Sequence, residues 1–111
     1  MALLFEGIVV DIAKLRNYCL CDNHPRGRHK ARVFRSRLGI TASDARQLQE
    51  SLLDAARTRQ GDLHPADSDE FGRRYVLDFS MTTAVGTAVI RSTWIALTGE
   101  NVLRLISCYV L

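Results

Sequence analysis

The sequence predicts an α+β fold, in which three N-terminal helices pack on a C-terminal antiparallel sheet of at least three strands. Up to residue 58, apolar residues recur at the three- and four-residue spacing of helices. From Arg73 onward they alternate with polar residues, as in strands with one buried face. Short connections between the last segments favour an antiparallel meander. The length of 111 residues predicts a single domain over residues 1–111.

We expect helices over residues 12–20, 28–38 and 42–58. The first ends before the His24-Pro25 step, because a residue that precedes proline avoids the helical conformation. Gly39 is a natural C-cap for the second helix, and the pattern Thr41-Ala-Ser-Asp44 is a capping box that opens the third. The apolar residues expected to face the sheet are Ala31, Phe34, Leu38, Leu48 and Leu52.

The alternating segments predict strands from Arg73 to about Met81, over residues 87–97 and over residues 103–110, with turns at Gly86 and at residues 98–101. Gly7 to Val10 fits either a short strand or an extended arm. Residues 60–72 contain glycine, proline and four acids, and their spacing matches no calcium loop. A solvated loop is therefore favoured there over a metal site.

Composition restricts the class of protein. A hydrophobic fraction of 47% and a charged fraction of 24% indicate a folded chain. The opening MALLFEGIVV has no basic n-region and is interrupted by Glu6, so no signal peptide is expected. No stretch approaches the length of a membrane span, and we expect a cytoplasmic protein. Cys19, Cys21 and Cys108 lack zinc-binding spacing, which predicts reduced thiols and no metal or other cofactor.

Basic residues gather between Asn23 and Gly39. No carboxylate lies between Asp22 and Asp44, and the stretch also holds His24 and His29. A local positive field of this kind suits an anion, most simply phosphate, although a solvated basic helix face has the same composition. The candidate nucleic-acid contacts are Arg26, Arg28, Arg32 and Arg35.

Four residues are candidates for chemistry around a phosphate. His24 could transfer a proton, or it could cap a turn. Lys30 could stabilise charge that develops on a phosphate, or be an ordinary solvated lysine. Arg91, in the middle of a strand, needs a partner, which could be phosphate or Asp78, and Ser92 is a short donor beside it. Such a set suits RNA, whose 2′-hydroxyl supplies the nucleophile without a metal ion.

The runs KLRNYCLCDNHPRGRHKARVFRSRLG, RRYVLDF and VIRSTWIALTGENVLRLISCYVL resemble a bacterial family of unknown function, DUF6883, from about Val10 to Leu111. The pattern N-H-P-x-G-x-x-K-A-x-x-F is also similar, more distantly, to polymorphic-toxin domains of the barnase–EndoU–colicin–RelE-like group. That likeness implies a metal-independent ribonuclease whose site combines a histidine, a basic residue and a strand serine or threonine. By position these are His24, Lys30, Arg91 and Ser92. The chain departs from the pattern at Cys19-Leu20-Cys21, away from the implied site.

Two functional hypotheses follow from these residues. The first is a metal-independent ribonuclease-like toxin domain that cleaves RNA by 2′-hydroxyl attack on the adjacent phosphate and has a cognate protein inhibitor. The alternative is a non-catalytic interaction module: an antitoxin, an immunity protein or an RNA-binding accessory. Convergence of His24, Lys30, Arg91 and Ser92 on one cleft would favour the enzyme, and scattered positions would favour the module.

Overall fold

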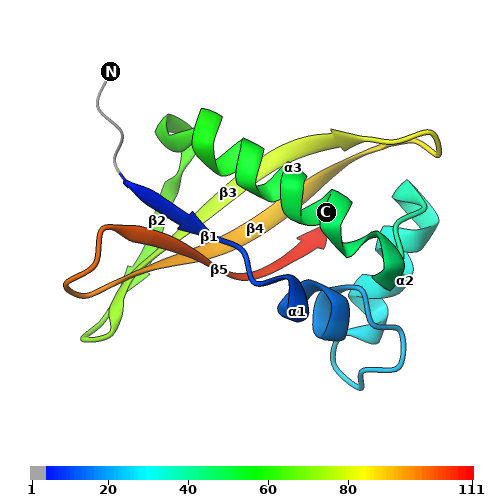
Figure 1. Cartoon of the computed structure of the whole chain (residues 1–111), viewed down its shortest axis with the longest axis horizontal. Coiled ribbons are helices and arrows are strands. Elements are labelled where there is room, and N and C mark those ends of the chain that lie inside the picture. The colour runs from blue at the N-terminus through cyan, green and yellow to red at the C-terminus, as the bar shows by residue number, and fades with distance from the viewer. Residues whose placement is uncertain (1–4) are drawn as a thin grey trace.

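The computed structural model describes residues 5–111. Its centre is a five-stranded sheet with the strand order β1-β5-β4-β3-β2. Figure 1 shows one long helix, α3, crossing one face of the sheet, while α1 and α2 lie together beside one end of β5. The strands are β1 (Gly7–Val9), β2 (His64–Ser68), β3 (Gly72–Thr82), β4 (Thr87–Leu97) and β5 (Val102–Val110).

Strands β3, β4 and β5 form the antiparallel part of the sheet. Alternate residues of β4 are buried on the helix side, among them Ile90, Ser92 and Trp94. The residues between them, including Arg91, lie on the face that α3 leaves uncovered. In the β4–β5 pair, Thr93 pairs with Ser107 and Trp94 with Leu105, so Ile106 is the extra residue of a β-bulge.

The predicted order of helices followed by a wholly antiparallel sheet is wrong. The fold is α+β, but β1 precedes the helices and pairs with β5 in parallel, with Gly7 opposite Val102 and Val9 opposite Arg104. The sheet is therefore mixed. Sequence alternation could not reveal this pairing, because β1 is short and its partner lies at the other end of the chain. Residues 1–4, part of the stretch used to judge a signal peptide, lie outside the described residues.

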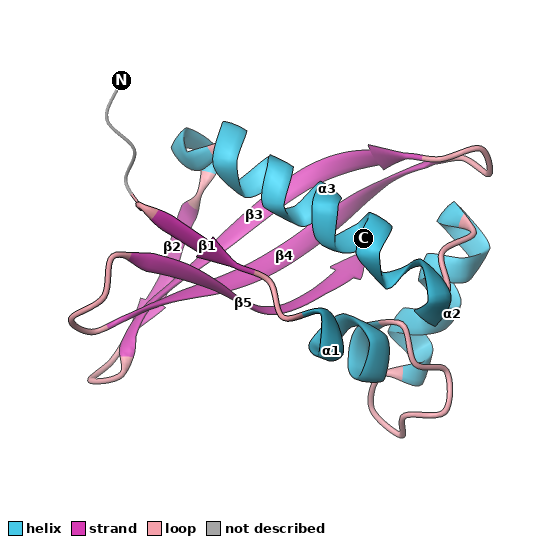
Figure 2. Cartoon of the chain, viewed as in Figure 1, coloured by secondary structure: helices cyan, strands magenta, loops and turns pink. Residues whose placement is uncertain are grey.

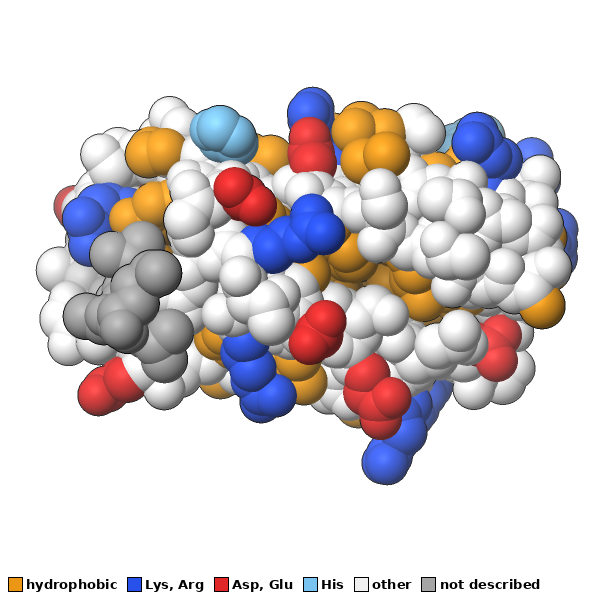
Figure 3. Space-filling model, turned by 90° about the horizontal axis from the view of Figure 1, so that it is seen from above, with side chains coloured by type: hydrophobic (Ala, Val, Ile, Leu, Met, Phe, Trp, Pro, Cys, Tyr) orange, Lys and Arg blue, Asp and Glu red, His pale blue; other side chains and the backbone are white. Residues whose placement is uncertain are grey.

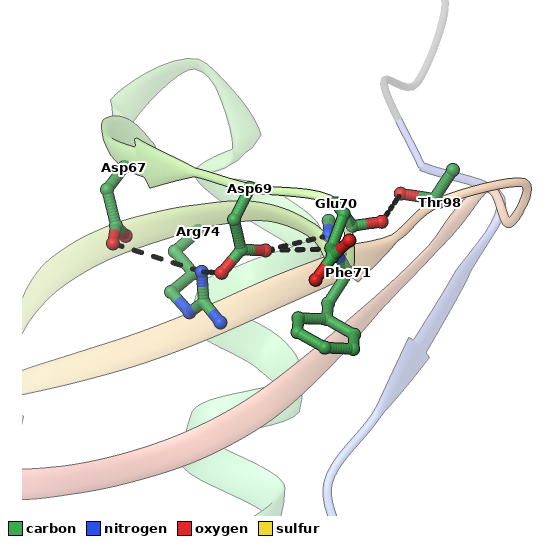
Figure 4. Close-up of polar contacts among 7 residues, drawn as sticks. Asp67, Asp69, Glu70, Phe71, Arg74 and Thr98 are labelled. Carbon is green, nitrogen blue, oxygen red and sulfur yellow. Dashed lines mark hydrogen bonds and ion pairs between the residues drawn. The ribbon is translucent and has the colours of Figure 1, made fainter.

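The predicted acidic loop also contains a strand. β2 is exposed along its whole length and pairs with β3 as an edge strand, so it has no apolar alternation to reveal it. Figure 4 shows how the following turn is held. Asp69 accepts hydrogen bonds from the backbone N–H groups of Phe71 and Gly72 and pairs with Arg74 at 2.9 Å. Arg74 also pairs with Asp67 at 3.8 Å, so β3 itself neutralises acids of this segment.

The helices begin and end close to the predicted positions. Figure 2 shows them on one side of the sheet and at its end. Gly39, with φ of 68°, caps α2, and Thr41 and Asp44 form the predicted capping box. The helical elements are α1 (Ile12–Lys14), the π-helical turn η1 (Leu15–Cys19), α2 (Arg28–Leu38), the short 3₁₀ turn η2 (Ala42–Asp44), α3 (Ala45–Thr58) and the 3₁₀ turn η3 (Gln60–Asp62).

One hydrophobic core lies between the helices and the sheet. Its largest fully buried side chains include Trp94 from β4 and Phe34 from α2. All five apolar residues predicted to face the sheet are buried, since Ala31, Phe34 and Leu38 lie on the inner side of α2 and Leu48 and Leu52 on that of α3. Packing these stripes on β3, β4 and β5 leaves the polar side of α2 in solvent. That arrangement places its basic residues on the surface.

Candidate functional site

The ammonium group of Lys30 lies between two aromatic rings. Its Nζ is 5.3 Å from the ring centroid of Tyr18, on η1, and 5.4 Å from that of Tyr109, on β5. Lys30 flanks the buried stripe of α2, and its ammonium group reaches Tyr109 at the free edge of β5, beyond the stretch that pairs with β1. Cation–π contacts of this kind fix a flexible ammonium group in place.

His24 lies against the same tyrosine. Its ring meets Tyr18 edge-on at 4.7 Å, and its Nδ1 accepts hydrogen bonds from the N–H groups of Arg26 and Gly27 at 3.0 and 3.1 Å. A neutral imidazole that accepts at Nδ1 carries its proton on Nε2. In this arrangement His24 caps the turn before α2, and its other nitrogen is a donor rather than a base. In this geometry His24 therefore caps the turn through Nδ1 and can also donate a hydrogen bond from Nε2.

Gly27 brings the chain close to Tyr18. A Cβ atom built at Gly27 would lie 2.2 Å from the carbonyl oxygen of Tyr18, so no other residue fits without movement of the backbone. This close approach packs the turn onto η1 and sets the position from which His24 reaches the Tyr18 ring. The glycine of the N-H-P-x-G pattern is therefore needed for this close packing of the turn against Tyr18.

Arg91 is held by Asp78. Its Nε and Nη2 donate to the two carboxylate oxygens at 2.9 and 2.8 Å, a bidentate pair across β3 and β4. Arg91 holds the pKa of Asp78 below its usual range, and the hydrogen bonds that Arg91 donates to Asp78 and, with a smaller effect, to Tyr109 raise the pKa of Arg91. The side chains of both partners are more than a third exposed. The sequence left two partners open for Arg91, phosphate and Asp78. In the structure Arg91 pairs with Asp78, and Tyr109 lies beside the pair.

Ser92 lies apart from the other candidates. It is fully buried on the helix side of β4, where its Oγ donates to the carbonyl of Leu77 at 2.7 Å and accepts from Trp94 Nε1 at 2.8 Å. Arg91 is on the opposite face of the same strand, because neighbouring residues of a strand alternate. The structure thus brings together His24, Lys30 and, through Tyr109, Arg91, but it does not bring Ser92 to them.

The outer side of α2 is strongly basic. The helix contains no carboxylate, and Arg26, Arg28, Arg32 and Arg35 are all exposed. Among residues 5–111, α2 makes a salt bridge through Arg35, whose Nη1 lies 3.5 Å from Asp22. On the face seen in Figure 3, by contrast, basic and acidic side chains are interspersed. The exposed arginines of α2 therefore form a basic surface without acidic side chains on the same helix.

A groove lies beside Lys30 that sequence reasoning missed. It has a volume of about 390 Å³ and is lined by Lys14, Tyr18, Lys30, Ile106 and Ser107. Lys14 Nζ donates to the carbonyl of Leu105 at 3.2 Å, which brings a second ammonium group to the groove. In the sequence, Tyr18 has the spacing of a core residue, and no residue pattern predicts the β-bulge at Ile106. Only the four-residue spacing of Lys14 and Tyr18 could have suggested a shared helix side.

Cys19 and Cys108 lie buried under this region as free thiols. Cys19 Sγ is 3.9 Å from Ser107 Oγ. A hydrogen bond from Cys108, more than the effect of Ser107 or the nearby Lys30, lowers the pKa of Cys19 to about 6. The same hydrogen bond, with burial, raises the pKa of Cys108.

Within residues 5–111, no group of three or more histidine, cysteine or acidic side chains is placed to hold a metal ion. None of the described helices is long and apolar enough to cross a membrane.

These features define a small α+β domain with a basic helix beside a groove that contains two lysines. A family model, a domain of unknown function called DUF6883, matches residues 4–111. The chain belongs to this family, which confirms the resemblance seen in its sequence. None of the curated proteins matches it.

A solved structure has a similar fold. It is a chain of a contact-dependent growth inhibition toxin–immunity protein complex from Klebsiella pneumoniae 342, with 16% sequence identity and a TM-score of 0.69. The alignment covers 93% of this chain and 99% of that chain. At this identity the likeness shows the fold alone.

Proposed function

We propose that this chain is one partner of a toxin–immunity pair and that it binds RNA through the exposed side of α2. The observation that carries the RNA-binding proposal is the set of exposed arginines on a helix without carboxylates, next to a lysine held between two aromatic rings. The likeness to a chain of a toxin–immunity complex supports a cognate protein partner. A protein that binds the same side of α2 would compete with RNA, which is one way for such a partner to inhibit.

The test of binding is its dependence on salt. If about four phosphates of a single strand are neutralised, the log–log slope of the binding constant against salt should be near −3. Arg28→Gln and Arg32→Gln should each reduce the slope by roughly 0.7. Arg46→Gln, at an exposed arginine of α3, is the matched control and should leave it unchanged. A binding constant that barely responds to salt would reject the role of α2.

Competition tests the protein partner. The product of the reading frame adjacent to this chain's gene is the first candidate to co-express, and the complex should elute as one species in size-exclusion chromatography. We expect this chain to stop binding RNA when the complex forms. An adjacent product that neither binds the chain nor affects RNA binding would count against the pairing.

A second candidate function is metal-independent RNA cleavage. It is favoured by the meeting of His24 and Lys30 at the Tyr18 ring, which places an imidazole and an ammonium group next to one groove. In this reaction the 2′-oxygen would attack the adjacent phosphorus as water accepts its proton, and the P–O5′ bond would break with the 5′-oxygen leaving and taking a proton from water. Lys30 would stabilise the charge on the phosphate, and His24 would donate a hydrogen bond from Nε2 to a phosphate oxygen. Ser92, buried in the core, has no part in this version of the reaction.

The cleavage assay needs a variant that keeps the cap. His24→Asn retains an oxygen that can accept the backbone N–H groups after it but removes the imidazole. Wild-type protein should cleave RNA in the presence of chelator and leave a cyclic phosphate, whereas His24→Asn should not. His29→Asn, at an exposed histidine of α2, is the control. If RNA stays intact after incubation with wild-type protein in the absence of the partner, the cleavage function is excluded and only RNA binding remains.

A further inference from the structure

The groove between η1, α2 and β5 differs chemically from the basic surface of α2. Two ammonium groups, from Lys14 and Lys30, stand at its wall, and Tyr18 and Ser107 contribute hydroxyl groups. Ile106 adds an aliphatic side chain. The groove is thus both cationic and apolar, and its cations are ammonium groups, whereas the exposed basic side chains of α2 are arginines. A bare phosphate would use only half of such a groove.

Local backbone structure places both parts of this lining. The β-bulge leaves Ile106 without a partner on β4, and bulges of this kind re-aim a side chain toward a site. Tyr18 lies on the π-helical turn η1. The N–H of Leu20 donates to the carbonyl of Leu15 at 2.8 Å, which is the five-residue hydrogen bond typical of a π-helix. Two irregular backbone segments therefore meet at one groove, and irregularities of both kinds are frequent at functional sites.

We infer that this groove holds one unpaired nucleotide of a single-stranded RNA, with its phosphate at Lys14 and Lys30 and its base against Ile106 and Tyr18. The inference rests on the proposed RNA binding and names the part of the RNA that is recognised. The groove has a volume of about 390 Å³, which lies within the roughly 300–1,000 Å³ of small-molecule sites. Bases inside a duplex are stacked and paired, so they cannot enter a groove unless they are flipped out.

Titration of isotopically labelled protein with adenosine monophosphate, adenosine and inorganic phosphate tests the groove. Adenosine monophosphate should shift the amide signals of Ile106 and Ser107 and bind at least about fivefold more tightly than adenosine or phosphate, because both halves of the groove are used. Lys14→Gln and Ile106→Ala should each weaken it about fivefold or more. Arg32→Gln, on the exposed side of α2, should leave nucleotide binding unchanged while weakening RNA binding.

Competition separates this inference from the proposal beneath it. A single-stranded oligoribonucleotide should displace adenosine monophosphate, and a blunt duplex of the same length should not. RNA that binds without displacing the nucleotide, or nucleotide signals that map away from Ile106 and Ser107, would overturn the groove and leave RNA binding by α2 intact. Phosphate that binds as tightly as the nucleotide would reduce the groove to an anion site and overturn recognition of the base. Nucleotide binding without any RNA binding would instead overturn the proposed function.

Discussion

Replacing Ser92 with alanine should destabilise the protein without touching the candidate site. Ser92 Oγ is the acceptor for the indole N–H of Trp94 and a donor to the carbonyl of Leu77, and both Ser92 and Trp94 are 0% exposed. Among the described residues, no buried side-chain polar atom lacks a hydrogen-bond partner. Ser92→Ala would create one at the indole nitrogen, in a place that water does not reach.

The magnitude follows from these two hydrogen bonds. A buried donor left unpaired costs about 1–3 kcal/mol, and the lost bond to the Leu77 carbonyl adds roughly 0.5–1.5 kcal/mol. We therefore expect the free energy of unfolding to fall by about 1.5–4.5 kcal/mol. For a chain of this size that corresponds to a decrease in Tm of roughly 6–18 °C.

Urea unfolding followed by tryptophan fluorescence measures this change, with Ser80→Ala as the control. Ser80 is an exposed serine of β3, and its replacement should alter stability by less than about 0.5 kcal/mol. A loss of less than about 0.5 kcal/mol for Ser92→Ala would refute the reasoning. So would a folded Ser92→Ala protein that has lost RNA binding or cleavage, because that result would return the serine to the functional site.

Three further predictions concern the turn, the sheet and the groove. Gly27→Ala should destabilise the protein measurably in thermal unfolding, because its Cβ would meet the Tyr18 carbonyl at 2.2 Å, and unchanged stability would show that the turn can move freely. The pKa of Asp78 is lowered in the folded state, so the stability it contributes is present above about pH 4 and is lost as pH falls through the folded value. Asp78→Asn should therefore lose less stability than wild type between about pH 4 and pH 2, and parallel curves would contradict this. Lys30→Gln should weaken RNA binding with no loss of helix signal in circular dichroism, and a binding constant equal to wild type would remove Lys30 from the interface.

The sequence predicted the elements better than their arrangement. α2 and β4 have the predicted bounds, since a stripe of apolar residues or a strict alternation marks each of them. β2 has no buried side and is held by backbone pairing, so its residues resemble a loop. The parallel pairing of β1 with β5 depends on contacts between the two ends of the chain. A pattern read within short windows cannot contain that information.

The candidate site shows the same limit. His24 and Lys30 were found because charge and polarity mark them along the chain, and they do lie at one ring. Arg91 and Ser92 are adjacent in the sequence, and strand geometry alone separates them to opposite faces. The positions of Tyr18 and Ile106 at the groove were not predicted, because a π-helical turn and a bulge set them. Such irregularities change where a side chain points without changing the local composition.

The pairing of β1 with β5 also affects how the chain can fold as it is made. β1 leaves the ribosome before the other strands of the sheet, and its partner β5 is synthesised only after the helices and the remaining strands. At roughly 5–20 residues per second, the early strand waits for several seconds before it can pair. Contacts between segments so distant in sequence slow folding, because a long loop must close before they form. A nascent chain would therefore complete its sheet only once β5 has been synthesised.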